Sequence, residues 1–281
     1  MFAHLRLAAA AFLFLLSLPF AIPAQALGLW LGGRWAKIVP LYWHRFVLRL
    51  FDIHLFVHGK IAGERPLLLL ANHISWLDIP VLSAIAPVSF IAKKEVADWP
   101  LFGLFSKLQR SVFIDRDRRH QTGKAADEIA GRLVAGDVMV LFPEGTSSDG
   151  NKVLAFRSAI VGAAQRSFSD GRPVTLQPVA IAYTRMLGMP FGRQHRHWVA
   201  WYGGMDLLPH LSRLMSQGAV DVHVAFLPPV TIARDGDRKR VTRAAGALVK
   251  EVVAELNAGR DPQKVMRMAE EISLEPEPER A

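Results

Sequence analysis

The sequence predicts an α/β fold with a largely parallel, mixed sheet flanked by helices, preceded by an N-terminal membrane-associated helical segment. Short apolar runs of strand length alternate with helical patterns along most of the chain. Several of these runs are followed directly by polar residues, as in the loops at the carboxyl ends of parallel strands. The 27 residues between Arg6 and Arg34 carry no formal charge and are mostly apolar.

The composition excludes several classes of protein. With 281 residues, of which 51% are hydrophobic and 21% charged, the chain can build a packed core and is neither disordered nor collagen-like. Charges occur throughout the chain after residue 34, which argues against a polytopic membrane protein. There is no cysteine, so a disulfide scaffold, a thiol nucleophile and a cysteine-ligated metal are excluded.

The first 50 residues read as a membrane anchor followed by an interfacial helix. One helix through the apolar segment would span roughly 40 Å, more than a ~30 Å hydrocarbon core. Pro19 and Pro23 interrupt the segment, so it forms either two short helices dipping into one leaflet or one kinked span. The flank carries aromatic and basic side chains, which predict an interface at the cytoplasmic face of the plasma membrane. These are Trp30, Trp35, Tyr42 and Trp43, with Arg34, Lys37, Arg45 and Arg49.

A cleaved signal peptide is the alternative for this segment. Ala24-Gln25-Ala26 matches a small-residue cleavage site. Against cleavage, the apolar run continues through Leu27–Leu31, and most of the basic charge follows the run instead of preceding it.

The second domain is predicted over residues 51–260. Strands are expected at Leu67–Ala71, Val88–Ala92, Val112–Ile114, Val138–Phe142, Val174–Ala182, His197–Tyr202 and Val220–Phe226. Helices are expected at Asp78–Ala86, Gln121–Ala135, Phe156–Phe168 and Lys239–Ala258. Residues 261–281 read as an acidic tail with a charge of −3, disordered from Ser273 onward.

Since the net charge is +9, residues 1–260 carry +12, which predicts a polyanionic partner. Anionic lipid and an acidic carrier protein fit that charge. The chain has no nucleic-acid-binding motif, so no nucleic-acid partner is expected.

The sharpest motif runs from Asn72 to Asp78 and follows a predicted strand directly. Its His73 can accept a proton near neutral pH, and the Asp78 carboxylate could fix the tautomer of the ring. Such a pair can act as a general base on a hydroxyl. Alternatively, Ser75 and Asp78 form a capping box at a helix start, and His73 is an ordinary loop residue.

Three further blocks accompany this motif. They are Phe113-Ile114-Asp115-Arg116, Phe142-Pro143-Glu144-Gly145-Thr146 and Gln177-Pro178-Val179-Ala180. In this order the four blocks resemble the glycerolipid acyltransferase family of the lysophosphatidic acid acyltransferase type, over about residues 35–235. The resemblance implies a glycerol-phosphate acyltransferase-like fold, with the catalytic domain at residues 51–260. It also implies an O-acyltransferase that uses acyl-CoA or acyl carrier protein, without metal or bound cofactor.

Carried onto this chain, the resemblance makes His73 the base and Asp78 its orienting partner. The remaining block residues would shape the acceptor site. They are Asn72, Arg110, Arg116, Glu144, Gly145, Thr146 and Ser147.

Two departures from the family pattern concern the acceptor. Ser147 stands where the family usually has an arginine that can grip a phosphate in two places. Arg110 stands where the family usually has glycine, and it could replace that arginine. The pattern resembles lyso-ornithine lipid acyltransferases more closely, with a lysophosphatidic acid acceptor as the alternative.

Weaker interpretations remain open. The stretch from Gly145 to Asp149 almost matches the nucleophile elbow of serine hydrolases. His195 and His197 could bind a metal but lack a nearby third ligand. The basic run after the second block is either a solvated face or a dock for an acidic carrier protein, through Arg118, Arg119 and Lys124. A noncatalytic basic membrane-binding protein is the rival from another class.

Overall fold

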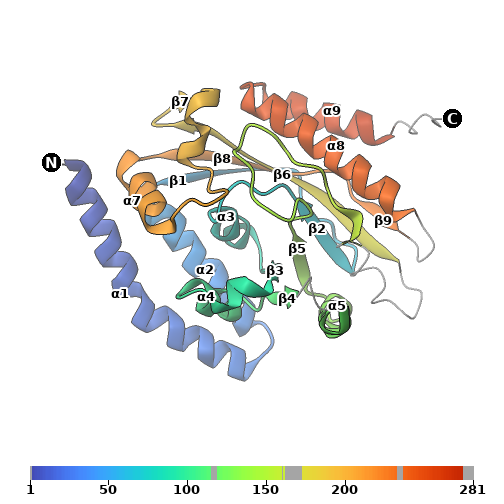
Figure 1. Cartoon of the computed structure of the whole chain (residues 1–281), viewed down its shortest axis with the longest axis horizontal. Helices are drawn as coiled ribbons and strands as arrows, with labels where there is room; N and C mark the ends of the chain where they lie inside the picture. The colour runs from blue at the N-terminus through green and yellow to red at the C-terminus, as the bar shows by residue number, and fades with distance from the viewer. Residues whose placement is uncertain (1, 115–118, 160, 162–172, 233–236, 275–281) are drawn as a thin grey trace.

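The computed structural model describes residues 2–114, 119–159, 161, 173–232 and 237–274, and its central feature is one mixed sheet with helices on both faces (Figure 1). The strands in the sheet follow the order β1-β8-β6-β2-β5-β3-β4, with β7 and β9 pairing with β6. Their bounds are β1 Ile53–His58, β2 Leu67–Ala71, β3 Val88–Lys93, β4 Val112–Ile114, β5 Val138–Leu141, β6 Val174–Met186, β7 Met189–Pro190, β8 Val220–Phe226 and β9 Val230–Ile232. The predicted α/β class is confirmed.

The middle of the sheet is parallel. Strand β2 pairs in parallel with β5 on one side and with β6 on the other, and β3 pairs in parallel with β5 and β4. Only the β6 pairs with β7, β8 and β9 are antiparallel in the described sheet. All five residues of β2 are buried, which explains why the sequence of this strand is a continuous apolar run.

Helices cover the two faces with separate cores. The α-helices are α1 Phe2–Leu31, α2 Trp35–Leu50, α3 Asp78–Ile85, α4 Phe102–Leu108, α5 Arg119–Val134, α7 Leu207–Gln217, α8 Arg238–Asn257 and α9 Pro262–Leu274, with short 3-10 helices η1 Lys94–Asp98 and η2 Arg193–Trp198. Leu67 and Leu69 of β2 belong to the core beneath α2, α3 and α7. Leu68 and Leu70 belong to the opposite core beneath α5, α8 and α9. Successive strand side chains point to opposite faces, so one apolar strand serves both layers.

Most predicted elements are present, with three differences. The strand expected at His197–Tyr202 is wrong, because these residues form the end of η2 and a loop in which Val199 and Ala200 are both buried. The predicted helix at Phe156–Phe168 lies mostly outside the described residues; Ser158, Ala159 and Val161 are helical. Strand β1 and helices α4 and α7 were not anticipated.

A helix was not anticipated in the acidic tail expected from residue 261, and it continues through Ser273 and Leu274, where disorder was expected. Residues 262–274 form helix α9, which packs on α8 and buries Val265 and Ala269 in the same core. Its apolar side chains recur at helical spacing, which the excess of acidic residues concealed. Residues 275–281 lie outside the described part of the chain.

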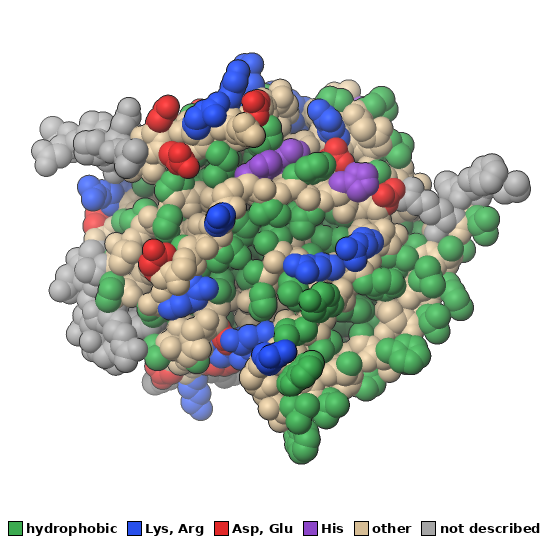
Figure 2. All heavy atoms as spheres, turned by 180° about the vertical axis from the view of Figure 1, so that it is seen from behind, with side chains coloured by type: hydrophobic (Ala, Val, Ile, Leu, Met, Phe, Trp, Pro, Cys, Tyr) green, Lys and Arg blue, Asp and Glu red, His purple; other side chains and the backbone are tan. Residues whose placement is uncertain are grey.

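The N-terminal segment is one continuous helix in this structure. Helix α1 includes Pro19 and Pro23, and it returns through a short turn into α2. It is long and apolar enough to cross a membrane. Many of its large apolar side chains are exposed, and green side chains gather along the lower right of the view in Figure 2. These features indicate association with a membrane.

Candidate active site

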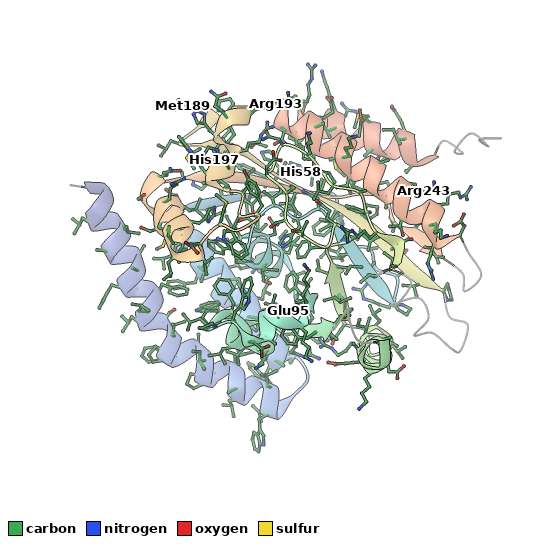
Figure 3. All side chains as sticks on the ribbon, in the orientation of Figure 1. His58, Glu95, Met189, Arg193, His197 and Arg243 are labelled. Atoms are coloured by element: carbon green, nitrogen blue, oxygen red, sulfur yellow. The ribbon has the colours of Figure 1, made fainter. Side chains whose placement is uncertain are left out.

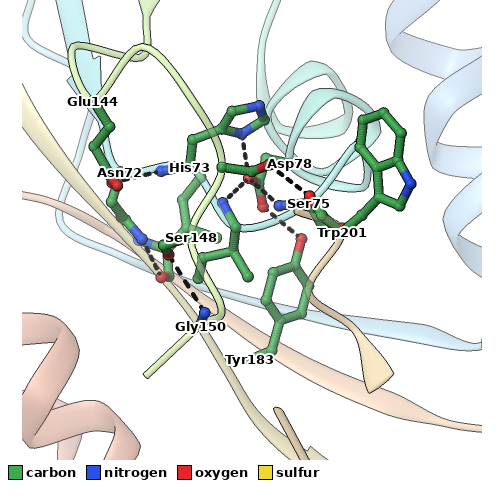
Figure 4. A network of polar contacts seen from close by, with 12 residues as sticks. Asn72, His73, Ser75, Asp78, Glu144, Ser148, Gly150, Tyr183 and Trp201 are labelled. Atoms are coloured by element: carbon green, nitrogen blue, oxygen red, sulfur yellow. Dashed lines mark hydrogen bonds and ion pairs between the residues drawn. The ribbon is translucent and has the colours of Figure 1, made fainter. Parts of the chain in front are cut away.

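The candidate site lies where β2 and β5 end, at the carboxyl edge of the parallel part of the sheet (Figure 4). The loop from Asn72 to Leu77 leaves β2, and the loop beginning at Phe142 leaves β5. The two loops are joined by a backbone hydrogen bond of 2.8 Å from the Ser148 amide to the His73 carbonyl. Adjacent parallel strands therefore bring the first and third sequence blocks together.

The His73 and Asp78 side chains form the pair predicted from the motif. Nδ1 of His73 lies 2.8 Å from Oδ2 of Asp78. The same oxygen accepts the backbone N–H groups of Ile74 at 2.7 Å and Ser75 at 2.9 Å. One carboxylate thus folds the loop and fixes the ring. Asp78 is completely buried, whereas 22% of the His73 side chain is exposed and can meet a substrate.

Only half of the capping-box alternative is present: Oδ2 of Asp78 accepts the Ser75 N–H at 2.9 Å, but the reciprocal hydrogen bond from the Ser75 side chain is missing among the described residues. Helix α3 begins at Asp78, its N-cap position is Leu77, and no side chain caps it. The Ser75 hydroxyl is buried without a hydrogen-bond partner in the described structure. Asp78 therefore binds the loop that precedes the helix, where it reaches the histidine.

The histidine ring is held on a second side by an aromatic contact. It stacks on Phe142 with the ring centroids 4.1 Å apart and the planes 17° from parallel. Because Nδ1 donates to the carboxylate, Nε2 is the nitrogen left to accept a proton from a hydroxyl group. The arrangement suits general-base catalysis.

Tyr183 is a member of this network that the sequence analysis missed. Its hydroxyl donates a hydrogen bond of 2.8 Å to Oδ1 of Asp78 from within β6. Burial, together with the Asp78 charge and this hydrogen bond, raises the pKa of Tyr183 well above its usual value, so the hydroxyl remains a donor. The sequence signal was slight, because the predicted strand ended one residue earlier, at Ala182.

Glu144, from the third block, holds the loop from below. Its Oε1 accepts the backbone N–H of His73 at 2.9 Å, and its Oε2 accepts that of Leu154 at 3.0 Å. The side chain is buried, and burial raises its pKa to about 7 despite these two hydrogen bonds. The nearby Asp78 charge acts in the same direction as burial. Each carboxylate oxygen accepts a backbone N–H, so Glu144 holds the backbone at His73 in place.

Comparison with known proteins agrees with this geometry. The family model described as Acyltransferase matches residues 54–182. The chain is 48% identical to the lyso-ornithine lipid O-acyltransferase of Brucella abortus. The aligned region covers 85% of this chain and 91% of the relative. This chain belongs to the acyltransferase family. It is also 43% identical to the enzyme of the same name from Rhizobium meliloti, over 85% of this chain and 82% of the relative. The resemblance drawn from the four blocks is thereby confirmed.

More distant relatives are named for a different acceptor. The acyltransferase is 32% identical to the 1-acyl-sn-glycerol-3-phosphate acyltransferase of Neisseria meningitidis, over 75% of this chain and 79% of the relative. A crystal structure of the 1-acyl-sn-glycerophosphate acyltransferase of Thermotoga maritima superposes with a TM-score of 0.62, covering 91% of this chain and 98% of the other at 24% identity. That likeness establishes the shared fold.

Asn72 was expected at the acceptor site and is instead a structural link. It is buried, its amide group donates to the Ile181 carbonyl at 3.0 Å, and its oxygen accepts the Ile181 N–H at 2.8 Å. Both ends of the amide are therefore occupied by the backbone of β6. Asn72 ties the start of the loop that carries His73 to the neighbouring strand β6.

Gly145, Thr146 and Ser147 do lie in the loop beside His73. Gly145 has a φ of +75°, a backbone conformation that favours glycine, and Thr146 is exposed. The Ser147 hydroxyl donates to the Trp201 carbonyl at 2.6 Å, and the Trp201 N–H donates to the Ile74 carbonyl at 2.9 Å. Because that hydroxyl is bound to backbone, the geometry does not support the nucleophile-elbow interpretation.

Arg110 is not brought to this site, which corrects the expectation that it could replace the missing arginine. It lies before β4, and its guanidinium pairs with Asp137, which precedes β5. His73 follows the other end of the parallel strands. The four-residue length of β5 separates the two edges by roughly 13 Å.

The remaining candidates are placed only in part. Arg116 and Arg118 lie outside the described residues, Arg119 is the first residue of α5, and Lys124 is exposed on that helix. His195 and His197 lie on η2, where both rings contact Trp198; His197 is labelled in Figure 3. Within the described ranges, no three His, Asp or Glu side chains are grouped to hold a metal ion.

The raised pKa of Glu144 predicts a pH-dependent stability. Since the native carboxyl holds its proton up to about pH 7, whereas the unfolded one loses it near 4.5, the free energy of unfolding should fall as pH rises through this window. The loss attributable to Glu144 is at most about 3 kcal/mol. Denaturant unfolding of the wild type and Glu144→Gln at pH 5 and pH 8 measures it.

The variant should be less stable at both pH values, because its amide nitrogen cannot accept the N–H of Leu154. It should nevertheless show a smaller difference between pH 5 and pH 8 than the wild type. Equal differences in the two proteins would contradict the assignment.

Proposed function

We propose that this acyltransferase transfers a fatty acyl chain to the free hydroxyl of lyso-ornithine lipid and so produces ornithine lipid. The observation that carries the proposal is the agreement of two relatives at 48% and 43% identity with the chemistry of residue 147. Both relatives bear the name lyso-ornithine lipid O-acyltransferase. Ser147 offers no cation, and its hydroxyl is bound to the Trp201 carbonyl. A phosphate-bearing acceptor would lack its usual arginine there.

The reaction follows from the position of the His73 ring. Nε2 takes the proton of the acceptor hydroxyl as the oxygen attacks the thioester carbonyl carbon. The buried Asp78 carboxylate stabilises the imidazolium that forms, through the 2.8 Å contact to Nδ1. Collapse of the tetrahedral intermediate breaks the carbon–sulfur bond, forms the ester and returns the proton to the thiolate. This direct transfer needs no covalent enzyme intermediate, metal or bound cofactor.

The donor and the location follow from charge and exposed apolar surface. Acyl carrier protein is an acidic partner and acyl-CoA an anionic one, and both suit a body of +12 with exposed Lys124 near the second block. The basic residues after α1 favour the cytoplasmic face of the plasma membrane. Retention of α1 is supported by Gln25, whose amide nitrogen donates to the carbonyls of Ala36 and Leu108 and so ties the helix to the domain.

The acceptor proposal predicts a measurable preference. With equal concentrations of lyso-ornithine lipid and lysophosphatidic acid, we expect lyso-ornithine lipid to be acylated about 10–150-fold faster in kcat/KM, as one lost charge-assisted hydrogen bond implies. Product formation from labelled acyl donor measures both. A preference of tenfold or more for lysophosphatidic acid would identify the alternative acceptor and leave the acyltransferase activity intact.

The matched variants are Ser147→Arg and Ser147→Ala. Ser147→Arg should shift preference toward lysophosphatidic acid, whereas Ser147→Ala, which loses the bond to Trp201 without adding charge, should not. If both variants change preference equally, the loop conformation and not the charge sets the acceptor.

A further inference from the structure

A second polar cluster lies at the amino-terminal edge of the sheet, on the side away from His73. Four of its residues line a groove between α2 and the starts of β3 and β5, and Arg132 joins them through its contact with Asp137. We call it the basic groove and define it by Lys37, Ser89, Arg110, Arg132 and Asp137. Neither the acyl transfer step nor the acceptor proposal uses these residues.

The basic groove contains three cations around one carboxylate. Asp137 is buried, and it contacts Nζ of Lys37 at 2.6 Å, the Arg110 guanidinium at 2.9 Å and Nε of Arg132. Burial opposes ionisation, but hydrogen bonds from Lys37 and Arg132 and the Arg110 charge outweigh it and lower the pKa of Asp137. The cluster therefore carries a net charge of +2. The single carboxylate of Asp137 neutralises only part of the positive charge of the cluster.

The three cations are not equivalent. Arg132 is occupied, because it also donates to the Arg110 carbonyl and to the Ser89 hydroxyl, each at 2.7 Å. Lys37 and Arg110 have side chains that are 35% and 27% exposed. Within the described residues their only side-chain hydrogen-bond or ion-pair partner is Asp137. Both residues line the groove, and each has more N–H donors than its contact with Asp137 uses.

The backbone of Arg110 is strained. Arg110 has a φ of +61°, in the left-handed region that glycine adopts freely and residues with a Cβ adopt with strain. Its N–H donates to the Lys107 carbonyl at 2.9 Å, which closes the end of α4. A strained arginine at a turn that would suit glycine is the kind of outlier from which function is inferred.

The groove adjoins the exposed apolar part of the molecule. Gln25 of α1 donates to the carbonyls of Ala36 and Leu108, the residues next to Lys37 and near Arg110. Trp30 and Trp35 are 81% and 52% exposed. Trp35 precedes Lys37 by two residues on α2. Figure 2 shows Lys and Arg side chains beside the apolar side chains of this end of the molecule. Cations beside such a surface would lie at the level of lipid headgroups.

We propose that the basic groove binds the phosphate group of an anionic membrane phospholipid through Lys37 and Arg110. A lipid held there is a bilayer component distinct from the acceptor, because the groove and His73 lie at opposite edges of the sheet. Binding would fix the orientation of the acyltransferase on the membrane. The inference rests on membrane association through α1 and is independent of which lysolipid is acylated.

The test measures which lipids the full-length protein retains. Purified in a neutral detergent, the protein is equilibrated with equal amounts of phosphatidylglycerol and phosphatidylcholine, and the bound lipids are quantified after removal of excess. We expect the wild type to retain phosphatidylglycerol preferentially. Lys37→Gln, which leaves Arg110 and Arg132 on Asp137, should lower the ratio of retained phosphatidylglycerol to phosphatidylcholine about fivefold. Arg110→Gly should do the same while relieving the strained backbone.

The control is Arg49→Gln, which removes an exposed cation from the same helix without touching the groove. It should leave the ratio close to that of the wild type. An equal loss in Arg49→Gln and Lys37→Gln would overturn the proposal in favour of diffuse attraction. Excess inorganic phosphate should not displace the lipid. If it abolishes the preference in the wild type, free phosphate is the ligand and the lipid assignment fails.

Asp137→Asn separates binding from a merely structural ion pair. The substitution raises the net charge of the groove from +2 to +3, so retention of phosphatidylglycerol should increase even if the melting temperature falls. A purely structural cluster would show the loss of stability without that increase. Acylation assays are not part of this readout, so failure of the acceptor proposal would not affect it.

Discussion

Replacing His73 with alanine should lower kcat for acyl transfer by about 10²–10⁴-fold, the usual contribution of a positioned general base. Nδ1 of the His73 ring contacts Asp78, so Nε2 is the nitrogen that can accept a proton. Without the ring, the acceptor hydroxyl has no group to take its proton. The melting temperature should change little, because the ring is partly exposed and the loop is held by Asp78 and Glu144 through backbone N–H groups.

Steady-state rates and a melting curve on the same preparation measure this prediction. His73→Gln, which keeps a polar side chain of similar size but cannot act as a base, is the matched control and should be equally inactive. Turnover in either variant within tenfold of the wild type would exclude His73 as the base.

Asp78→Asn should lower kcat by about 10³–10⁴-fold, the size of effect seen when an amide replaces the carboxylate of a catalytic triad. It should also destabilise the protein. An amide nitrogen at the position of Oδ2 cannot accept the N–H groups of Ile74 and Ser75, nor that of the His73 ring. Leaving buried donors unpaired costs about 1–3 kcal/mol each.

Tyr183→Phe tests whether activity depends on the contact between Asp78 and His73 or on every hydrogen bond that Asp78 accepts. It removes the hydrogen bond to Oδ1 and leaves the contacts of Oδ2 with His73 and the loop unchanged. We expect a reduction of less than about tenfold in kcat with a modest loss of stability. If Tyr183→Phe were as inactive as Asp78→Asn at equal melting temperature, the tyrosine itself would have a catalytic role.

The sequence alone was enough to predict the fold class and the contact between His73 and Asp78. Both follow from local sequence patterns. A strand buried on two faces is a continuous apolar run, as in Leu67–Ala71, and the loop that follows it carries His73 and Asp78 within six residues. This motif and the three further blocks, in their order along the chain, were enough to indicate the acyltransferase family.

The contacts of the other polar residues could be read only from the folded chain. Asn72 lies next to His73 in sequence, yet both ends of its amide bind the backbone of β6, 109 residues away. Glu144 supports His73 from a different strand, and Tyr183 reaches Asp78 from a third. His73 and Glu144 each follow a strand, whereas Arg110 precedes one. It therefore lies at the opposite edge of the sheet, where it pairs with Asp137. A motif gives residue types and spacing along the chain, whereas the partner of a buried polar group depends on which strands become neighbours and on which end of each strand it stands.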